Sequence, residues 1–274
     1  MPYVCIIGAG KVGHSLYYAL RRNHIESTLI DRSTLDLKNR VAQSELTLIT
    51  TQDSKIESTC EQISPWVTEG STVAHCSGAL NSQILESAAK HGAFTGCAHP
   101  LNTFPSMEIA RELLTKNNHD TYCYLSGHSN ALTLLEKTFS AIGFHVSYIN
   151  DKSKAAYHAA CVFLCNYLTS ISETGLQIAE SAGLDRDEFW NAVKPLIEAT
   201  LNNISDHGTA ASLSGPIVRG DLSTISVHLS ALNSAPEIIS KTYKVLGQQA
   251  ANLAQKSGNI DKQTAEQIRS LLDD

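Results

Sequence analysis

The stretch that decides the fold is residues 3–31, which read YVCIIGAGKVGHSLYYALRRNHIESTLID. A strand-like apolar run comes first, and the glycines of a GxGxxG pattern follow it at Gly8, Gly10 and Gly13. A helix-like run comes next, and a second apolar run ends at Asp31, 18 residues after Gly13. A strand, this glycine loop, a helix and an acid at about that distance form the fingerprint of a dinucleotide-binding Rossmann unit.

The residues of this loop each have a physical reason to be there. Gly8 permits the tight turn, Gly10 lets a pyrophosphate approach the backbone, and Gly13 lets the helix pack closely on the strand. The N–H groups that open the helix, at Lys11 and Val12, would face the pyrophosphate, which the helix dipole also attracts. The alternative is a glycine-rich turn of an α/β sheet that binds no ligand.

Length and composition narrow the class of protein. The chain has 274 residues, 42% of them hydrophobic and 18% charged, and its formal net charge is −6. Two domains are expected at this length. The negative charge and the lack of a basic block argue against partners that are nucleic acids or anionic membranes. No apolar run approaches the roughly 18 residues of a membrane span.

Cysteine and histidine usage indicates a reduced, metal-free protein. The seven cysteines form no CxxC pair, and no two of the eleven histidines lie within four residues of each other. We therefore expect free thiols in a cytoplasmic protein, and no local metal motif, although distant residues could still assemble a metal site. The N-terminus passes directly into a strand, which leaves no room for a signal peptide.

Up to about residue 150, short β-rich runs alternate with helical patterns. This alternation predicts βαβ units and a mostly parallel sheet. Beyond residue 150 the pattern is helical throughout. We therefore predict an α/β fold, with a Rossmann dinucleotide-binding domain at residues 1–150 and an all-α domain at residues 151–274. Further strands are expected at residues 46–50, 71–75, 94–97, 121–126 and 144–149, helices at 55–67, 81–91, 129–142, 154–182, 185–203, 221–232, 236–256 and 261–272, and a loop at 205–220.

The residues after the second strand bear on the choice of cofactor. Asp31 stands where the adenosine ribose should lie, and an acid there favours NAD. Arg32 and Ser33 follow it and could hold the 2′-phosphate of NADP. Charge alone leaves both cofactors open, and Arg32 could also be a solvated loop residue.

Polar residues follow the next strands at the edge where open α/β sheets bind ligands. We expect Thr51 and Gln52 to contact the cofactor and Ser77 to contact the substrate. His99 is the first candidate for proton transfer, because an imidazole ordinarily titrates near neutral pH. The alternative is a histidine that only bonds to backbone at a strand end.

The start of the long helix carries a polar stripe. Lys154 and His158 are four residues apart on one face, and Asn166 lies eight residues after His158. The stripe could face a cleft between the domains, where Lys154 and Asn166 would orient the substrate and His158 would be the second candidate for proton transfer. Alternatively, Lys154 reaches solvent and His158 is an interior histidine with satisfied hydrogen bonds.

Several motifs together resemble an uncharacterised family of Rossmann-like candidate NADP oxidoreductases with a C-terminal helical domain of unknown function. This family looks like a branch of the 6-phosphogluconate-dehydrogenase-like superfamily. The resemblance implies a nicotinamide cofactor, NADP with NAD as the alternative, an active site between the domains, and a homodimer formed through the helical domain. The motifs are the Gly8–Gly13 loop, HCSG at 75–78, HPLNTF at 99–104, YHAA at 157–160 with Asn166-Tyr167, and GPI at 215–217 with RGD at 219–221.

Two members of that superfamily bear on the catalytic residues. Prephenate dehydrogenases place a catalytic histidine before a proline at a strand end, and His99-Pro100 resembles that arrangement. In β-hydroxyacid dehydrogenases a lysine is followed four residues later by asparagine. Here His158 stands four residues after Lys154, so that motif is broken.

The sequence thus predicts an NAD(P)-dependent oxidoreductase that transfers a hydride between nicotinamide and a small polar substrate, a carboxylate. A rival from another class is a dinucleotide-binding sensor or assembly protein without turnover. A Rossmann-type methyltransferase is disfavoured, because the three-glycine loop and the helical second half fit dehydrogenases better.

Overall fold

The computed structural model describes residues 2–31, 34, 36–103 and 121–273. Contacts divide the chain into two compact units, residues 1–164 and 165–274. Strands stop before residue 150, while residues 151–164 still make their contacts with the first unit. The functional boundary expected at residues 150 and 151 stays a prediction.

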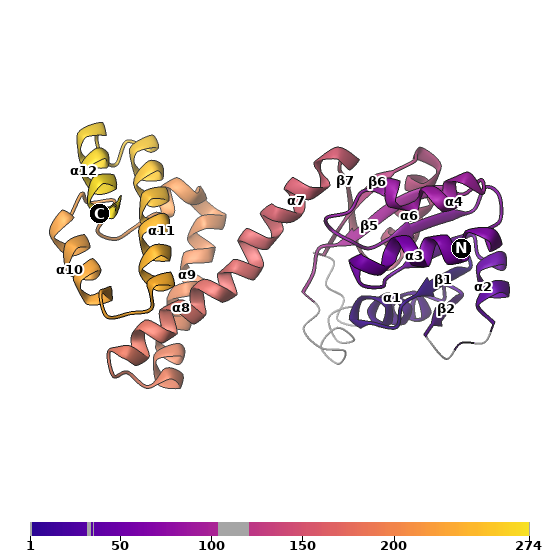
Figure 1. The fold of residues 1–274 in the computed structure, drawn as a ribbon, viewed down its shortest axis with the longest axis horizontal. Coiled ribbons are helices and arrows are strands. Elements are labelled where there is room, and N and C mark those ends of the chain that lie inside the picture. Colours follow the sequence, from indigo (N-terminus) through magenta and orange to yellow (C-terminus); the bar gives the residue numbers. More distant parts are fainter. Residues whose placement is uncertain (1, 32–33, 35, 104–120, 274) are drawn as a thin grey trace. The chain divides into compact units, whose positions relative to one another are not determined.

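The first unit is built on a seven-stranded sheet (Figure 1). Neighbouring strands are parallel except β5 and β6, which are antiparallel. The predicted α/β Rossmann class is confirmed. The order across the sheet is β2 (Ser27–Ile30), β1 (Val4–Ile7), β3 (Leu46–Ile49), β4 (Thr72–His75), β5 (Phe94–Pro100), β6 (Tyr122–Gly127) and β7 (His145–Tyr148).

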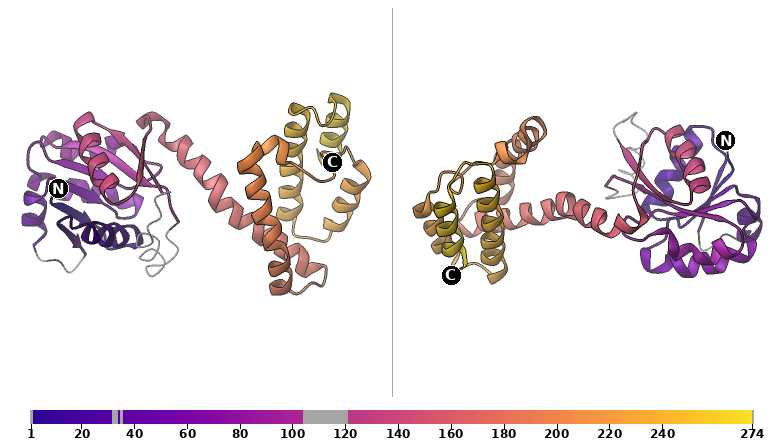
Figure 2. Two further views of the ribbon diagram at one scale, coloured as in Figure 1. Left: turned by 180° about the vertical axis from the view of Figure 1, so that it is seen from behind. Right: turned by 90° about the horizontal axis from the view of Figure 1, so that it is seen from above.

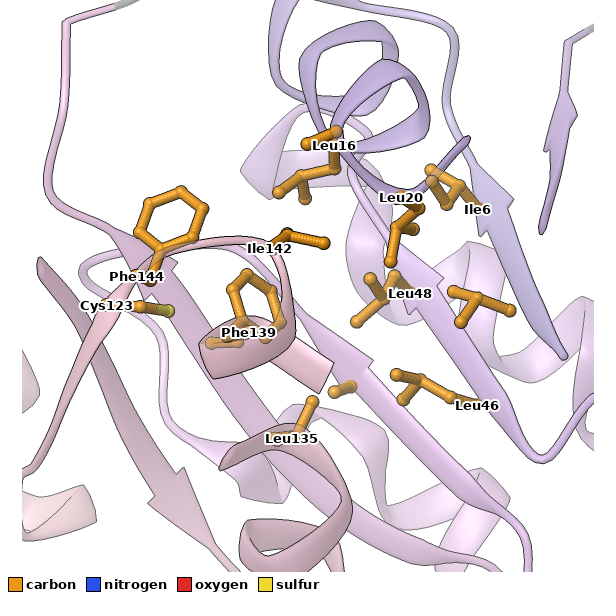
Figure 3. Packing of buried hydrophobic residues seen from close by; sticks show 14 of the residues in the cluster. Ile6, Leu16, Leu20, Leu46, Leu48, Cys123, Leu135, Phe139, Ile142 and Phe144 are labelled. Atoms are coloured by element: carbon orange, nitrogen blue, oxygen red, sulfur yellow. The ribbon is translucent and has the colours of Figure 1, made fainter. Parts of the chain in front are cut away.

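Successive side chains of a strand point to opposite faces of the sheet, so the apolar strands have buried residues on both faces. Helices cover both of these faces. Val4 and Ile6 pack with α1 (Lys11–Arg22) and α6 (Ser129–Ala141). Figure 3 shows this cluster, with Leu16, Leu20 and Phe139 over the strands. The alternate residues of β1 pack with the helices of the other face, which are α2 (Leu37–Gln43), α3 (Asp53–Ile63) with the 3₁₀ turn η1 (Ser64–Trp66), and α4 (Glu86–Lys90) with η2 (Ser82–Leu85).

Strands β2, β1, β3 and β4 end at the same level of the sheet, whereas β5 continues beyond it. The register pairs Ile7 with Ile49, Ile49 with His75, and His75 with Cys97. Strand β5 was predicted to end at residue 97, but it continues to Pro100 because it also pairs with β6. His99 therefore lies two residues beyond the level at which the neighbouring strands end.

A single helical path leads from the first unit into the second. It comprises η3 (Asp151–Ser153), α7 (Lys154–Cys161), the π-helical turn η4 (Val162–Asn166) and α8 (Tyr167–Ser181). The predicted long helix at residues 154–182 is therefore present, with one π turn inside it.

The second unit contains helices alone among its described residues, as predicted. They include α9 (Arg186–Ser212), α10 (Leu222–Leu232), α11 (Glu237–Lys256) and α12 (Lys262–Asp273). Its core lies between α10, α11 and α12 (Figure 2). Two helices begin at acidic caps: the side chain of Asp185 accepts from Glu188 N at 2.9 Å, and that of Asp221 accepts from Thr224 N at 3.0 Å.

The loop expected at residues 205–220 is partly wrong. Helix α9 continues to Ser212, and the chain only kinks at Gly208, where φ is 78° and ψ is 167°. Glycine reaches this backbone region at little cost. Helical structure resumes after the kink, so the serine and glycine content of this stretch does not indicate a loop before Leu213.

The seven cysteines are free and differ in their environment. Cys5, Cys97 and Cys123 are fully buried, whereas Cys165 is exposed. Burial raises the pKa of the Cys5 thiol to about 12 and that of Cys97 to about 11. In the described part of the chain, no helix has the length and apolar character needed to cross a membrane.

Candidate functional site

The glycine loop between β1 and α1 is packed too closely for side chains. Gly8 has φ of 120°, and a Cβ at Gly13 would lie 2.0 Å from the Gly8 carbonyl oxygen. Thr50 Oγ1 donates to that oxygen at 2.8 Å and holds the turn against β3. A Cβ at Gly10, by contrast, would have no neighbouring atom within 4 Å. The backbone at Gly10 is therefore open to a ligand.

The start of α1 suits an anion. The first backbone bond of the helix runs from His14 N to Gly10 O at 2.9 Å. The amide groups of Val12 and Gly13 precede it, and amides in this position have no acceptor within their own helix. They and the helix dipole can bind a phosphate group. These residues fit the pyrophosphate of a dinucleotide.

Strand β1 lies between β2 and β3, at the point where the strand order reverses. Ligands of open α/β sheets bind beside such a switch point. Asp31 follows β2 there, is exposed, and accepts from Thr34 Oγ1 at 3.0 Å. Arg32 and Ser33, the residues expected to hold a 2′-phosphate, lie outside the described residues.

Thr51 and Gln52 follow β3. Gln52 is exposed and precedes α3. The side-chain oxygen of Thr51 is buried and has no hydrogen-bond partner among the described residues. Because leaving a buried hydroxyl unpaired is unfavourable, Thr51 is well suited to bind a polar group of a cofactor.

Ser77 is buried in the turn after β4, and its hydroxyl already has several partners. The oxygen donates to Asp53 Oδ2 at 2.7 Å and accepts from Ala79 N at 3.2 Å and Leu80 N at 3.1 Å. The hydroxyl therefore shapes this turn. Its expected contact with substrate stays a prediction.

His75 stabilises the same turn through hydrogen bonds to its backbone. Ser77 N donates to His75 Nδ1 at 3.1 Å, and His75 Nε2 donates to Asn81 O at 3.1 Å. Burial lowers the pKa of His75 to about 4. An uncharged imidazole bonded to backbone at both nitrogens has a structural role.

His99 is bonded to a side chain instead. Its Nδ1 lies 2.9 Å from the hydroxyl of Tyr157, and its ring meets that of His158 edge-on, with ring centroids 5.8 Å apart. Burial, together with the charges of Lys154 and His158, lowers the pKa of His99 to about 4. The expectation that His99 ionises near neutral pH therefore does not agree with its surroundings.

Gly78 is the place where the two imidazoles converge. A Cβ there would lie 2.4 Å from His158 Cδ2 and 2.9 Å from His99 Nε2. The absence of a side chain lets both rings approach this turn. Gly78 and Tyr157 were not among the predicted site residues, although each directly follows or precedes one, Ser77 and His158 respectively.

Lys154 is 1% exposed and does not reach solvent. Its ammonium group donates to Ser77 O at 2.9 Å and to Cys97 Sγ at 2.5 Å. These bonds attach the start of α7 to the ends of β4 and β5. Asn166 is exposed and belongs to the second unit, and its role in orienting the substrate stays a prediction.

The described side chains include no group of three or more His, Cys, Asp or Glu residues that could hold a metal ion. This edge of the sheet carries two imidazoles, the ammonium group of Lys154, the hydroxyl of Tyr157, the carboxylate of Asp53 and backbone amides.

Two family models match separate parts of the chain. Residues 22–100 match a Rossmann-like domain, and residues 121–250 match a domain of unknown function (DUF2520). The chain combines a Rossmann-like domain with a DUF2520 domain. This pairing agrees with the family resemblance inferred from the motifs.

Solved structures with a similar fold extend over almost the whole chain. A candidate NADP oxidoreductase from Bacteroides fragilis is 20% identical with a TM-score of 0.74, covering 93% of this chain and 98% of its own. Pyrroline carboxylate reductase from Plasmodium falciparum, solved with NADP bound, is 12% identical with a TM-score of 0.62, covering 98% of each chain.

An imine reductase from a Pseudomonas species is 17% identical with a TM-score of 0.56, covering 98% of this chain and 91% of its own. At these identities the similarity establishes the fold alone. A comparison with curated proteins gave no match.

Proposed function

We propose that this protein is a cytoplasmic NAD(P)-dependent oxidoreductase acting on a small polar substrate, a carboxylate. One observation carries the proposal: the same sheet edge holds a glycine loop open at Gly10 and two imidazoles that converge on Gly78. The free state of all seven cysteines supports a reducing compartment. The proteins named above as NADP oxidoreductase, pyrroline carboxylate reductase and imine reductase support the reaction class.

The cofactor in this proposal is NADP, with NAD as the alternative. When bound, the nicotinamide ring supplies or accepts the hydride. The backbone at Gly10 and the amides of Val12 and Gly13 would hold the pyrophosphate, and Asp31 the adenosine ribose. The buried hydroxyl of Thr51 would gain a partner. The full set proposed to bind the cofactor is Gly8, Gly10, Lys11, Val12, Gly13, Asp31, Arg32, Ser33, Thr51 and Gln52.

The chain's own residues would serve the reacting polar group of the substrate. Reduction of a polar double bond leaves negative charge on its heteroatom, which must receive a proton. His99 and His158 are the two imidazoles that could assist there. The buried ammonium of Lys154 favours a negatively charged substrate by Coulomb attraction. This charge supports a carboxylate as the substrate class.

We also propose a homodimer formed through the helical unit. Helix α9 has no buried residue, although Trp190, Leu196, Leu201 and Ile204 along it are large and apolar. Exposed apolar surface of this kind commonly marks a protein interface. A second copy of the chain could cover this surface without the participation of any other protein.

Titration calorimetry tests the cofactor proposal. A side chain at Gly10 would occupy the space left for the pyrophosphate, so Gly10→Val should weaken NADPH binding by more than about tenfold, or 1.4 kcal/mol. Gly175→Val is the matched control, because a Cβ at Gly175 also meets no atom within 4 Å but lies in the helical unit. Unchanged binding by a folded Gly10→Val variant would reject this site. A wild-type chain that binds neither NADPH nor NADH would reject the oxidoreductase.

A non-catalytic dinucleotide sensor is the second candidate. The observation that favours it is that Ser77 and Lys154, two of the proposed substrate-binding residues, already bond inside the protein. A substrate screen that follows nicotinamide absorbance separates the two functions. Tight cofactor binding without turnover on any small carbonyl or imine acid would favour the sensor.

A further inference from the structure

Tyr157 is the side chain most closely associated with His99. Its hydroxyl oxygen lies 2.9 Å from His99 Nδ1, and the two rings meet edge-to-face at an interplanar angle of 87°. The other ring nitrogen of His99, Nε2, is the one that approaches Gly78. Tyr157 therefore bonds to Nδ1 of the imidazole, while Nε2 lies at the turn after β4.

The position of Tyr157 is fixed from two sides. Its ring packs on that of Tyr124, with ring centroids 4.9 Å apart, and Tyr124 is the β6 residue paired with His99 in the sheet. One turn earlier in α7, Lys154 bonds to the ends of β4 and β5. The hydroxyl is thus held in place by contacts that do not involve His99.

The protonation of both groups limits each of them to one proton that it can offer to this hydrogen bond. Burial raises the pKa of Tyr157, so its phenol keeps its proton. The pKa of His99 is lowered to about 4, mainly by burial. Lys154 and His158 on α7 and His75 on β4 act in the same direction, and the carboxylate of Asp53 opposes them. At neutral pH the imidazole therefore carries a single N–H, on either Nδ1 or Nε2.

We propose that Tyr157 is a positioning residue whose O–H donates to His99 Nδ1, which places the single imidazole proton on Nε2 beside Gly78. Resting on the proposed function, this assignment makes His99 an uncharged hydrogen-bond donor to the substrate. Neutral imidazole can polarise a carbonyl in this way. The substrate class it fits is a polar double bond, C=O or C=N, whose heteroatom accepts the bond from Nε2–H.

The proton balance then assigns separate tasks to the two histidines. In reduction, the substrate carbon gains a hydride with its two electrons, the π bond breaks, and the heteroatom gains one proton. His99 keeps its N–H throughout and only hydrogen bonds. The proton comes from His158 in its charged form or from solvent through it. The nicotinamide cofactor is the reductant of the proposed function.

Nitrogen NMR of the full chain, labelled with ¹⁵N in histidine, tests the assignment without any substrate. The His99 signals are identified by their loss in His99→Gln. At pH 7 we expect the wild type to carry the proton on Nε2 and none on Nδ1. Tyr157→Phe keeps the ring and removes the hydroxyl, so its His99 should change to a mixture of both tautomers. Tyr124→Phe is the matched control and should keep the wild-type tautomer.

Two outcomes would overturn the proposal: a proton on Nδ1 in the wild type, or a tautomer that is the same in wild type and Tyr157→Phe. The wild-type measurement decides the first even if the variant fails to fold. NADPH calorimetry on the same sample keeps the proposals apart, because an Nε2–H tautomer in a chain that binds no cofactor rejects only the oxidoreductase. With a substrate in hand, Tyr157→Phe should lower kcat by about threefold to tenfold and leave NADPH affinity within about twofold.

Discussion

The two units of this chain bury their apolar residues very differently. In the first unit, both faces of the sheet are covered by the unit's own helices, and Phe139 and Leu135 of α6 are fully buried. In the second unit, α9 extends over 27 residues without a buried one. Helices in proteins gain most of their stability from packing of an apolar face. The comparison teaches that the sheet unit covers its own apolar faces, whereas helix α9 of the helical unit buries none of its residues.

The largest expected effect comes from opening a cavity in the sheet unit. Phe139→Ala should lower the free energy of unfolding by about 3–5 kcal/mol, because Phe139 is 0% exposed and its contacts cannot be replaced. Leu196→Ala on α9, where the residue is 65% exposed, should change it by less than about 0.5 kcal/mol. Urea denaturation followed by circular dichroism measures both. Equal losses would contradict the comparison.

Acid should weaken the sheet unit next. The folded-state pKa values of His75 and His99 are lowered to about 4, so the unfolded chain takes up protons first. Their stabilisation is complete above about pH 6.5 and declines as pH falls toward about 4; for buried His75 it amounts to about 3 kcal/mol. Urea midpoints at pH 7 and pH 4.5 measure the loss.

Two variants check that this acid sensitivity comes from the buried imidazole. His75→Gln should reduce the difference between the two urea midpoints. His145→Gln, at an exposed position on β7, should leave the difference unchanged. A wild-type midpoint that does not move between these pH values would contradict the buried, uncharged state of His75.

The smallest expected effect concerns helix α9 of the helical unit. If a second copy covers α9, Leu201→Glu places a charge in that interface and should weaken self-association by about tenfold or more, or 1.4 kcal/mol. Asn202→Glu is the control at the adjacent exposed position. Sedimentation velocity over a range of concentrations measures both variants. A wild-type chain that stays monomeric throughout would reject the proposed dimer.

Much of the fold could be predicted because local chemistry determines it. Apolar β-rich runs located the strands, and Gly92 and Gly143, both with positive φ, follow the ends of their helices, where glycine is favoured. The extension of β5 to Pro100 could not be predicted, since it depends on pairing with β6, more than twenty residues away. The kink at Gly208 inside α9 was also missed, because glycine and serine are equally typical of loops.

The candidate site was predictable in position but not in bonding. Parallel strands end at one edge, so Ser77 and His99 could be assigned to it from their place after strands. The partner of His99 is Tyr157, 58 residues away, and the ammonium of Lys154 turns inward to atoms 77 and 57 residues distant. Such side-chain directions depend on packing between elements. The lowered pKa of His99 follows from that packing and cannot be derived from residue type.

The contrast among the cysteines has a practical consequence for chemical labelling. Alkylating reagents attack the thiolate, and they must also reach it. Cys5 and Cys97 are fully buried and keep their protons, so they resist such reagents in the folded chain. Cys165, the first residue of the second unit, is exposed. The native chain therefore offers a thiol at the junction of its units to which a spectroscopic probe can be attached while the sheet stays unmodified.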